Sequence, residues 1–259
     1  KTLKTVYSYD INDRLLESID YQIDGAEETA VRYTEYQYDS RGQTTGYAEL
    51  SQENEPTADE IKAHQIRYHY DSDGKLTKVT YPTTKNGVQA LAYEYDQNGW
   101  LTKIKGEVQS GDGSTEKTVR SYTYDSYGNV SSVTTDGRTY TCYLWSYCNQ
   151  YPIAKIVNVT YDALLSALGK DKAWVEQLGN MTSPDTEMET INSLRQKLPE
   201  AQVYTYTHRI LVGATSITEP DGMTTYFEYD TFGRVIRSYI LENGVPKTLS
   251  TNEYNTPKF

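Results

Sequence analysis

Six copies of one short pattern organise this chain: an aromatic residue, a variable residue, Tyr-Asp, and a turn residue three positions after the Asp. The Tyr-Asp pairs are Tyr9-Asp10, Tyr38-Asp39, Tyr70-Asp71, Tyr95-Asp96, Tyr124-Asp125 and Tyr229-Asp230, and the turn residues are Asp13, Gly42, Gly74, Gly99, Gly128 and Gly233. The first five copies follow one another at intervals of about 25–32 residues. Repetition with this period predicts a stacked architecture in which each unit covers the apolar face of its neighbour.

Each copy has the local chemistry of a β-hairpin. The two aromatic residues lie two positions apart, so they share one face of a strand. The Asp-x-x-Gly that follows is typical of a type I turn with Gly in the left-handed position. Two residues after the turn residue, an aliphatic residue begins a return strand in five of the copies. In the remaining copy, that of Asp39, Thr44 takes this place.

A second class of turn predicts how one hairpin joins the next. These turns are Asp24-Gly25, Asn86-Gly87, Asp136-Gly137, Asp221-Gly222 and Asn243-Gly244, with Gly111-Asp112-Gly113 in the same role and a longer polar loop at 51–58. Asp-Gly and Asn-Gly are strong hairpin signals. We therefore expect a meander in which every strand pairs with its neighbours in sequence, leaving an unpaired strand at each end that is capped or pairs with another chain.

The interval between Tyr124 and Tyr229 interrupts this rhythm with a helical pattern at 160–198. Thr160 and Asp171 predict the N-caps of two helices, and Ser183-Pro184-Asp185 predicts the start of a third. Short helices cannot bury their apolar faces alone, so we expect them to pack on the sheet. The expected domains are a β-hairpin array at 1–159, a helical insertion at 160–198 and a continuation of the array at 199–259.

Composition restricts the partners and the core. The 36 acidic residues exceed the 25 basic ones and give a net charge of −11. This balance argues against nucleic acid as a partner, and no apolar run is long enough for membrane insertion. The 26 tyrosines against three Phe and three Trp predict that Tyr forms much of a thin, partly hydrated core. The chain begins with Lys1, inside the repeat pattern, which we interpret as a segment of a longer protein.

The repeat Tyr-x-Tyr-Asp-x-x-Gly-x-Leu-x-x-Val, seen in full at Tyr68 to Val79, resembles the RHS/YD-repeat family of large exported proteins. The stretch Tyr143 to Ala154 and the helical pattern after it resemble the version found in Bacteroidetes. The resemblance implies a mainly β fold, a strip of antiparallel hairpins that forms part of a shell, here an open curved array. It also implies a secreted or cell-surface location, and flanking YD repeats of the same polypeptide as partners. In the family, such shells enclose a toxin or support cell adhesion. The family's self-cleaving core region has no counterpart in this sequence.

No residue pattern in the sequence singles out a catalytic or metal-binding site. Asp71-Ser72-Asp73-Gly74 lacks the distant Glu of a calcium loop, so Asp71 is expected to accept backbone N–H groups in its own turn. The three His residues, Cys142 and Cys148 lack the spacing of a zinc site, and we expect both thiols to be free. We predict no cofactor, no metal and no enzyme activity.

The sequence leaves two functions open. The first is a structural segment that encloses or displays another domain. The alternative is a module that binds a cell-surface carbohydrate or protein through a Tyr-rich sheet face. In either case the residues of interest are those of the repeat motif: Tyr9, Asp10, Tyr38, Asp39, Gly42, Tyr70, Asp71, Gly74, Tyr95, Asp96, Gly99, Tyr124, Asp125, Gly128, Tyr229, Asp230 and Gly233.

Overall fold

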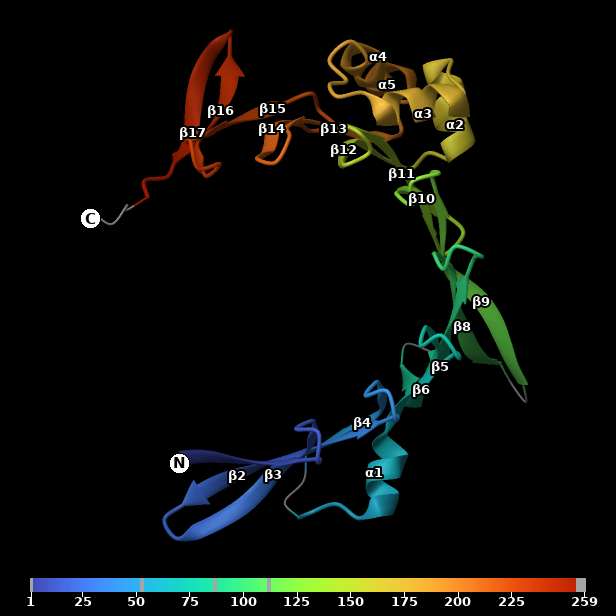
Figure 1. Cartoon of the computed structure of the whole chain (residues 1–259), viewed down its shortest axis with the longest axis vertical. Coiled ribbons are helices and arrows are strands. Elements are labelled where there is room, and N and C mark those ends of the chain that lie inside the picture. The colour runs from blue at the N-terminus through green and yellow to red at the C-terminus, as the bar shows by residue number, and fades with distance from the viewer. Residues whose placement is uncertain (1, 52–53, 86–87, 111–112, 255–259) are drawn as a thin grey trace. The chain divides into compact units, whose positions relative to one another are not determined.

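A computed structural model describes residues 2–51, 54–85, 88–110 and 113–254. In these ranges the chain is mainly β, with 17 strands and five helices (Figure 1). In chain order the elements are β1 (Thr2–Tyr9), β2 (Leu15–Asp24), β3 (Glu27–Tyr38), β4 (Thr44–Leu50), α1 (Ala58–His64), β5 (Ile66–Tyr70), β6 (Leu76–Lys85), β7 (Val88–Tyr95), β8 (Leu101–Ser110), β9 (Gly113–Tyr124), β10 (Val130–Thr135), β11 (Thr139–Ser146), β12 (Tyr151–Val157), α2 (Tyr161–Leu168), α3 (Lys172–Asn180), α4 (Met188–Asn192), α5 (Leu194–Lys197), β13 (Gln202–Arg209), β14 (Gly213–Thr218), β15 (Thr224–Tyr229), β16 (Val235–Glu242) and β17 (Val245–Thr251). The predicted fold class, a mainly β array of antiparallel hairpins with a small helical insertion, is confirmed.

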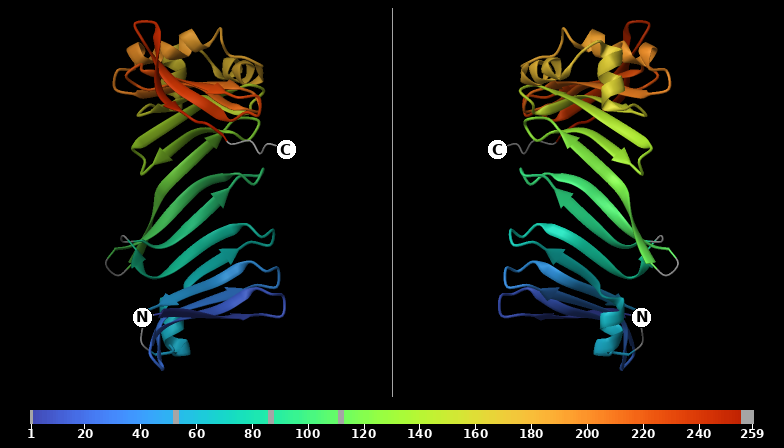
Figure 2. Two further views of the ribbon diagram at one scale, coloured as in Figure 1. Left: turned by 90° about the vertical axis from the view of Figure 1, so that its left-hand side faces the viewer. Right: turned by 90° about the vertical axis from the view of Figure 1, so that its right-hand side faces the viewer.

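The chain divides into two compact units, residues 1–119 and 120–259. In the first unit, antiparallel pairing runs from β1 to β8 in sequence order. In the second unit it runs in the same way from the end of β9 to β17. Figure 2 shows the strands of each unit side by side. Among the described residues, no pairing joins the last strand of either unit back to its first, so each sheet is open.

The end strands carry many exposed side chains. In β1, Leu3 is 72% exposed and every described residue is exposed; β17 is likewise exposed along its length. Exposed edge strands recruit further strands. Pairing or capping of these edges stays a prediction.

The densest core lies in the second unit, where helices α2 to α5 pack on strands β11 to β13 (Figure 1). Its fully buried side chains are mostly aliphatic, including Leu144, Ile156, Leu164 and Leu178. A smaller cluster around Ile19 supports the first unit. The prediction that Tyr forms much of the core is therefore wrong for the fully buried positions. The repeat tyrosines from Tyr38 onward are half-buried, because a hydroxyl that must reach a hydrogen-bond partner favours a position near the surface.

Two of the predicted helices begin where the sequence indicates, and the third begins later. The Thr160 side chain caps α2 and the Asp171 side chain caps α3, as predicted, and Gly169 ends α2 in a left-handed conformation. The third helix does not begin at Ser183. Its first regular residue is Met188, because Pro184 opens a turn in which its carbonyl accepts from the N–H groups of Glu187 and Met188.

Helix α1 is absent from the sequence-based prediction, which assigned a loop to 51–58 and no helix after it. The helix begins with a capping box in which Thr57 and Glu60 exchange hydrogen bonds. Ile61 packs against the small core of the first unit. A capping box ahead of a short segment is a recognisable signal.

Candidate functional site

The six repeat turns share one hydrogen-bond geometry. In each, one carboxylate oxygen of the Asp accepts from the backbone N–H groups two and four residues later, at 2.8–3.0 Å. The Asp N–H also donates to the carbonyl of the fourth residue. The turns are those of Asp10, Asp39, Asp71, Asp96, Asp125 and Asp230. These carboxylates close the turns that join the outgoing strands to the return strands.

The turn residue three after the Asp is left-handed in every copy. Asp13 has a φ of 59°, and the five glycines have φ between 76° and 86°. Three of these glycines also lie close to a side chain of the preceding repeat, and a Cβ at Gly74 would lie 3.3 Å from Gln43 Oε1. A Cβ at Gly42 would lie 3.2 Å from Arg14 Nη1, and one at Gly99 would lie 2.7 Å from Lys75 Nζ. The left-handed backbone conformation is therefore what favours glycine here, since the ends of the neighbouring Arg and Lys side chains are flexible and can move aside.

In four of the repeats, the tyrosine before the Asp connects one repeat to the next. The hydroxyl of Tyr38 donates to the carbonyl of Leu15, and that of Tyr70 donates to the carbonyl of Thr44. The same bond joins Tyr95 to Leu76 and Tyr229 to Ala214, and the four distances are 2.7–2.9 Å. In the first three cases the acceptor is the first residue of the previous repeat's return strand. We call these tyrosine-to-carbonyl bonds rungs.

Two further rungs were not predicted from the sequence. Trp145 Nε1 donates to the carbonyl of Val130 at 2.8 Å, and the Tyr254 hydroxyl donates to the carbonyl of Val235 at 3.0 Å. Val130 and Val235 begin return strands, so both donors occupy the rung position of a repeat that lacks the Tyr-Asp pair. The signal for Trp145 is weak in the sequence: an aromatic residue two positions after Tyr143.

The turn at 219–223 joins β14 to β15, as Asp221-Gly222 predicts for the hairpin-joining class, but it has the geometry of the repeat turn. Glu219 takes the place of the repeat Asp in its backbone pattern: its N–H donates to the carbonyl of Met223, and its own carbonyl accepts from Gly222. Gly222 has a φ of 88°. The chain thus uses the repeat turn once more without the Tyr-Asp signature. By contrast, Asn86-Gly87 and most of Gly111-Asp112-Gly113 lie outside the described residues.

Electrostatics fix the protonation states of the motif. In the turns of Asp10, Asp39 and Asp230, the backbone N–H four residues on is the largest cause of a lowered carboxyl pKa. Burial raises the pKa of the Tyr70 and Tyr95 hydroxyls. These acids are ionised and these phenols neutral near pH 7, so neither group is prepared to exchange a proton with a substrate.

The cysteines and histidines that sequence reasoning considered do not come together. Cys142 and Cys148 are free; Cys142 is buried, with a thiol pKa raised to about 12 by burial, whereas Cys148 is exposed. His69 lies in β5, while His208 stacks on Tyr151 with ring centroids 4.9 Å apart. Within the described ranges, no three His, Cys, Asp or Glu side chains form a group suited to a metal ion.

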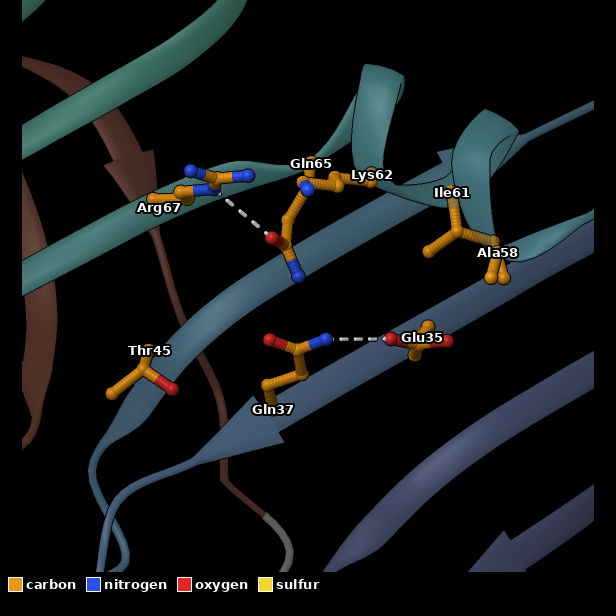
Figure 3. Close-up of a pocket in the computed structure, with 8 residues that line it drawn as sticks. All are labelled: Glu35, Gln37, Thr45, Ala58, Ile61, Lys62, Gln65 and Arg67. Atoms are coloured by element: carbon orange, nitrogen blue, oxygen red, sulfur yellow. Dashed lines mark hydrogen bonds between the residues drawn. The ribbon is translucent and has the colours of Figure 1, made fainter.

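A hollow of about 450 Å³ lies over β13 to β15 beside α4. Two further hollows of ligand size lie elsewhere in the described part of the chain. One, of about 470 Å³, lies where α1 crosses β3 to β5 and is lined mainly by polar side chains (Figure 3). Its amides are engaged with neighbours, since Gln37 donates to Glu35 and Gln65 accepts from Arg67. The other, of about 360 Å³, lies between the turn after β9 and helices α2 and α3. None of the helices in the described part of the chain has the length and apolar character of a membrane span.

Part of the sequence matches a known family, and most of the fold aligns with solved structures. Residues 70–115 match a family model described as RHS Repeat. Chains in the crystal structures titled TcdB2-TccC3-Cdc42 and TcdB2-TccC3-TEV align with 94% and 96% of this chain, at 14% and 15% identity and a TM-score of 0.52 each. TcdB2-TccC3 itself aligns at 13% identity with a TM-score of 0.51. At this identity the likeness shows the fold alone, and this chain spans 12% of the length of those chains. No curated protein sequence matches it.

Proposed function

We propose that this chain, which carries sequence of the RHS repeat family at residues 70–115, is a non-catalytic structural segment of a larger exported protein. In this proposal its hairpins form part of a β-hairpin shell or scaffold that encloses or displays another domain, such as a toxin. Its partners are flanking repeats of the same polypeptide. A secreted or cell-surface location belongs to the same proposal and rests on the family.

The ladder of rungs is the observation that carries this proposal. The repeat aspartates are all bonded to the backbone of their own turns, and four of the repeat tyrosines are bonded to the backbone of the preceding repeat. Tyr70 and Tyr95 illustrate this, since each donates its hydroxyl to a strand carbonyl. Of the motif residues, Tyr124 and Asp125 also line the cleft beside α2 and α3. A motif whose polar atoms bond to backbone in this way serves to extend a sheet. The function then depends on the domain that the sheet surrounds or presents.

The alternative is recognition of a glycan or protein by the Tyr-rich sheet face. It is the weaker proposal, because the rings of Tyr70 and Tyr95 are half-buried and their hydroxyls are already bonded. Glycan-array binding that disappears on Tyr70→Ala or Tyr95→Ala, but persists in Tyr7→Ala with its exposed ring, would favour this alternative.

Limited proteolysis of the full-length polypeptide tests the scaffold proposal. A domain enclosed by the repeats should resist protease while the repeats are folded, and become sensitive when Tyr38, Tyr70 and Tyr95 are changed to Phe together. Tyr9→Phe, at the same motif position on the edge strand β1, is the control. A non-repeat domain cleaved at the same rate in all three proteins would show that the repeats do not enclose it.

A further inference from the structure

The cleft between the hairpin β9–β10 and helices α2 and α3 has the dimensions and chemistry of a ligand site. Its volume of about 360 Å³ falls within the range of small-molecule pockets, roughly 300–1,000 Å³. Tyr124, Tyr161 and Val175 contribute half-buried rings and an aliphatic surface. Asp162, Lys172 and Glu176 are exposed residues of its wall and complete a charged rim. Because the cleft lies at the junction of the insertion with the sheet, the repeating motif does not account for it.

Hydrogen bonds connect the two walls of the cleft. The Tyr127 hydroxyl, in the turn after β9, donates to Asn180 Oδ1 at the end of α3 at 2.9 Å. Asn129 Nδ2, in the same turn, donates to the carbonyl of Asn149 at 3.0 Å. The N–H of Asn149 in turn donates to the carbonyl of Gly179 at 2.7 Å.

The segment that makes this connection is strained. Tyr147, Cys148 and Asn149 have φ of 54°, 57° and 62°, and three consecutive non-glycine residues rarely adopt this conformation. The N–H groups of Cys148 and Asn149 reach carbonyls at or just after the end of α3, as Cys148 donates to Met181 at 2.9 Å. The strained turn therefore holds α3 in place, and the cleft is formed in advance of any ligand.

The open hydrogen-bonding groups of the cleft wall include two carboxylates, those of Asp162 and Glu176, and one ammonium, that of Lys172. The Thr123 hydroxyl is already bonded to those of Ser131 and Ser132, at 2.8 and 2.7 Å. Among the described residues, the carboxylates of Asp162 and Glu176 have no side-chain hydrogen bond or ion pair. Unsatisfied carboxylates accept best from a charged donor.

The charge and the aromatic surface of the cleft both favour a cationic ligand. Three acids, including Asp125, and one base line the cleft, which leaves it with a net charge of −2 (−3 + 1). Both carboxylate oxygens of Asp125 accept hydrogen bonds within its own turn. Asp125 therefore adds negative charge to the cleft but does not bond a ligand directly. Burial raises the pKa of Tyr161 to about 12, so its ring stays a neutral phenol of the kind that attracts cations over its face.

We propose that this cleft binds a primary ammonium group on an alkyl chain. In this arrangement, Glu176 and Asp162 accept hydrogen bonds from the ammonium, and Tyr161 and Val175 cover the alkyl chain. The ammonium can belong to a free diamine or to a lysine side chain of a polypeptide, and the two sources share this chemistry. The assignment is independent of the scaffold function proposed above.

Calorimetric titration of the intact chain with 1,5-diaminopentane and with Nα-acetyl-lysine amide tests the proposal and separates the two sources. We expect saturable binding that weakens about threefold to fivefold in Glu176→Gln and in Asp162→Asn, the loss typical of one exposed charged contact. Glu200→Gln, which removes an exposed acid outside the cleft, should bind as the unchanged chain does. Binding of the diamine alone indicates a free amine, and binding of the lysine derivative alone indicates a polypeptide side chain.

The same titration can overturn the proposal. No binding of either amine would refute it. An equal loss in Glu200→Gln would show general attraction to an acidic protein rather than a site. Binding of methyl glucoside in the cleft in place of the amines would assign the cleft to saccharides instead. Circular dichroism of each variant confirms that a loss of binding is not a loss of fold.

Discussion

The hydroxyl of Tyr95 donates a 2.8 Å hydrogen bond to the backbone carbonyl of Leu76. Tyr95 ends the outgoing strand of one repeat, and Leu76 begins the return strand of the repeat before it. The strand register adds a second regularity, because Tyr95 pairs with Leu101 after a one-residue shift that recurs in the other repeats, as at Tyr70 and Leu76. One side chain thus marks the end of its own hairpin and contacts the preceding one, which explains why a two-residue signature suffices to define a repeat.

Replacement of Gly74 by Val is expected to lower the free energy of unfolding by more than about 1 kcal/mol. Gly74 has a φ of 84°, and a Cβ there would lie 3.3 Å from Gln43 Oε1 of the preceding repeat. A β-branched residue resists this backbone conformation. Urea unfolding measures the change. Gly113→Val is the control, because Gly113 lies in a strand with open space around it, and equal losses in both variants would contradict the turn geometry.

His208 is expected to make the second unit less stable in mild acid. Its Nδ1 is buried without a hydrogen-bond partner among the described residues, and burial lowers its pKa from 6.5. As the pH falls through about 6.5, the unfolded chain takes up the proton before the folded chain does, so stability declines until the pH reaches the folded pKa. Above pH 6.5 this contribution is fully present.

Urea unfolding at several pH values between about 8 and 5 measures this effect, as the slope of the unfolding free energy against pH. His208→Gln should reduce the slope in this window. An identical slope in the unchanged chain and in His208→Gln would show that another group titrates there.

The two thiols should differ sharply in reactivity. Cys142 is fully buried, its Sγ donates to the carbonyl of Val159, and its pKa is raised to about 12, whereas Cys148 is exposed. Because the thiolate is the reactive form, brief iodoacetamide treatment of the native chain should modify Cys148 alone, and both thiols after denaturation. Mass spectrometry of peptides distinguishes the sites. Native modification of Cys142 at a similar rate would contradict its burial in the core that β11 forms with the helices.

The predictable part of the fold rests on residues whose local chemistry decides their conformation. Gly74 and its equivalents predict the turns, and Thr160 and Asp171 predict the starts of two helices. Each of these residues determines the conformation or the hydrogen bonding of the backbone next to it. The rung of Trp145 and the repeat-turn geometry at Glu219 were not predicted, since there the surrounding sheet selects a geometry that the residue type does not indicate. The cleft beside Tyr161 depends on contacts between segments distant in sequence, and no local pattern reports those.

Helix α1 was missed for a different reason. Thr57 and Glu60 form a capping box that the sequence displays, but the segment is short and follows a polar loop. A helix of this length is marginal alone and depends on tertiary contact, which Ile61 supplies. Here the signal was present and its tertiary support was not visible.

Urea unfolding of the triple variant Tyr38→Phe, Tyr70→Phe and Tyr95→Phe tests the coupling of repeats most directly. Each change deletes one rung hydroxyl and leaves its ring in place, so we expect a total loss of about 2–4 kcal/mol, roughly 1 kcal/mol for each hydrogen bond. Tyr9→Phe removes the hydroxyl at the same motif position, where the ring is 56% exposed and no hydroxyl bond is seen among the described residues, and should cost almost nothing. A triple variant as stable as Tyr9→Phe would contradict the claim that these tyrosines join one repeat to the next.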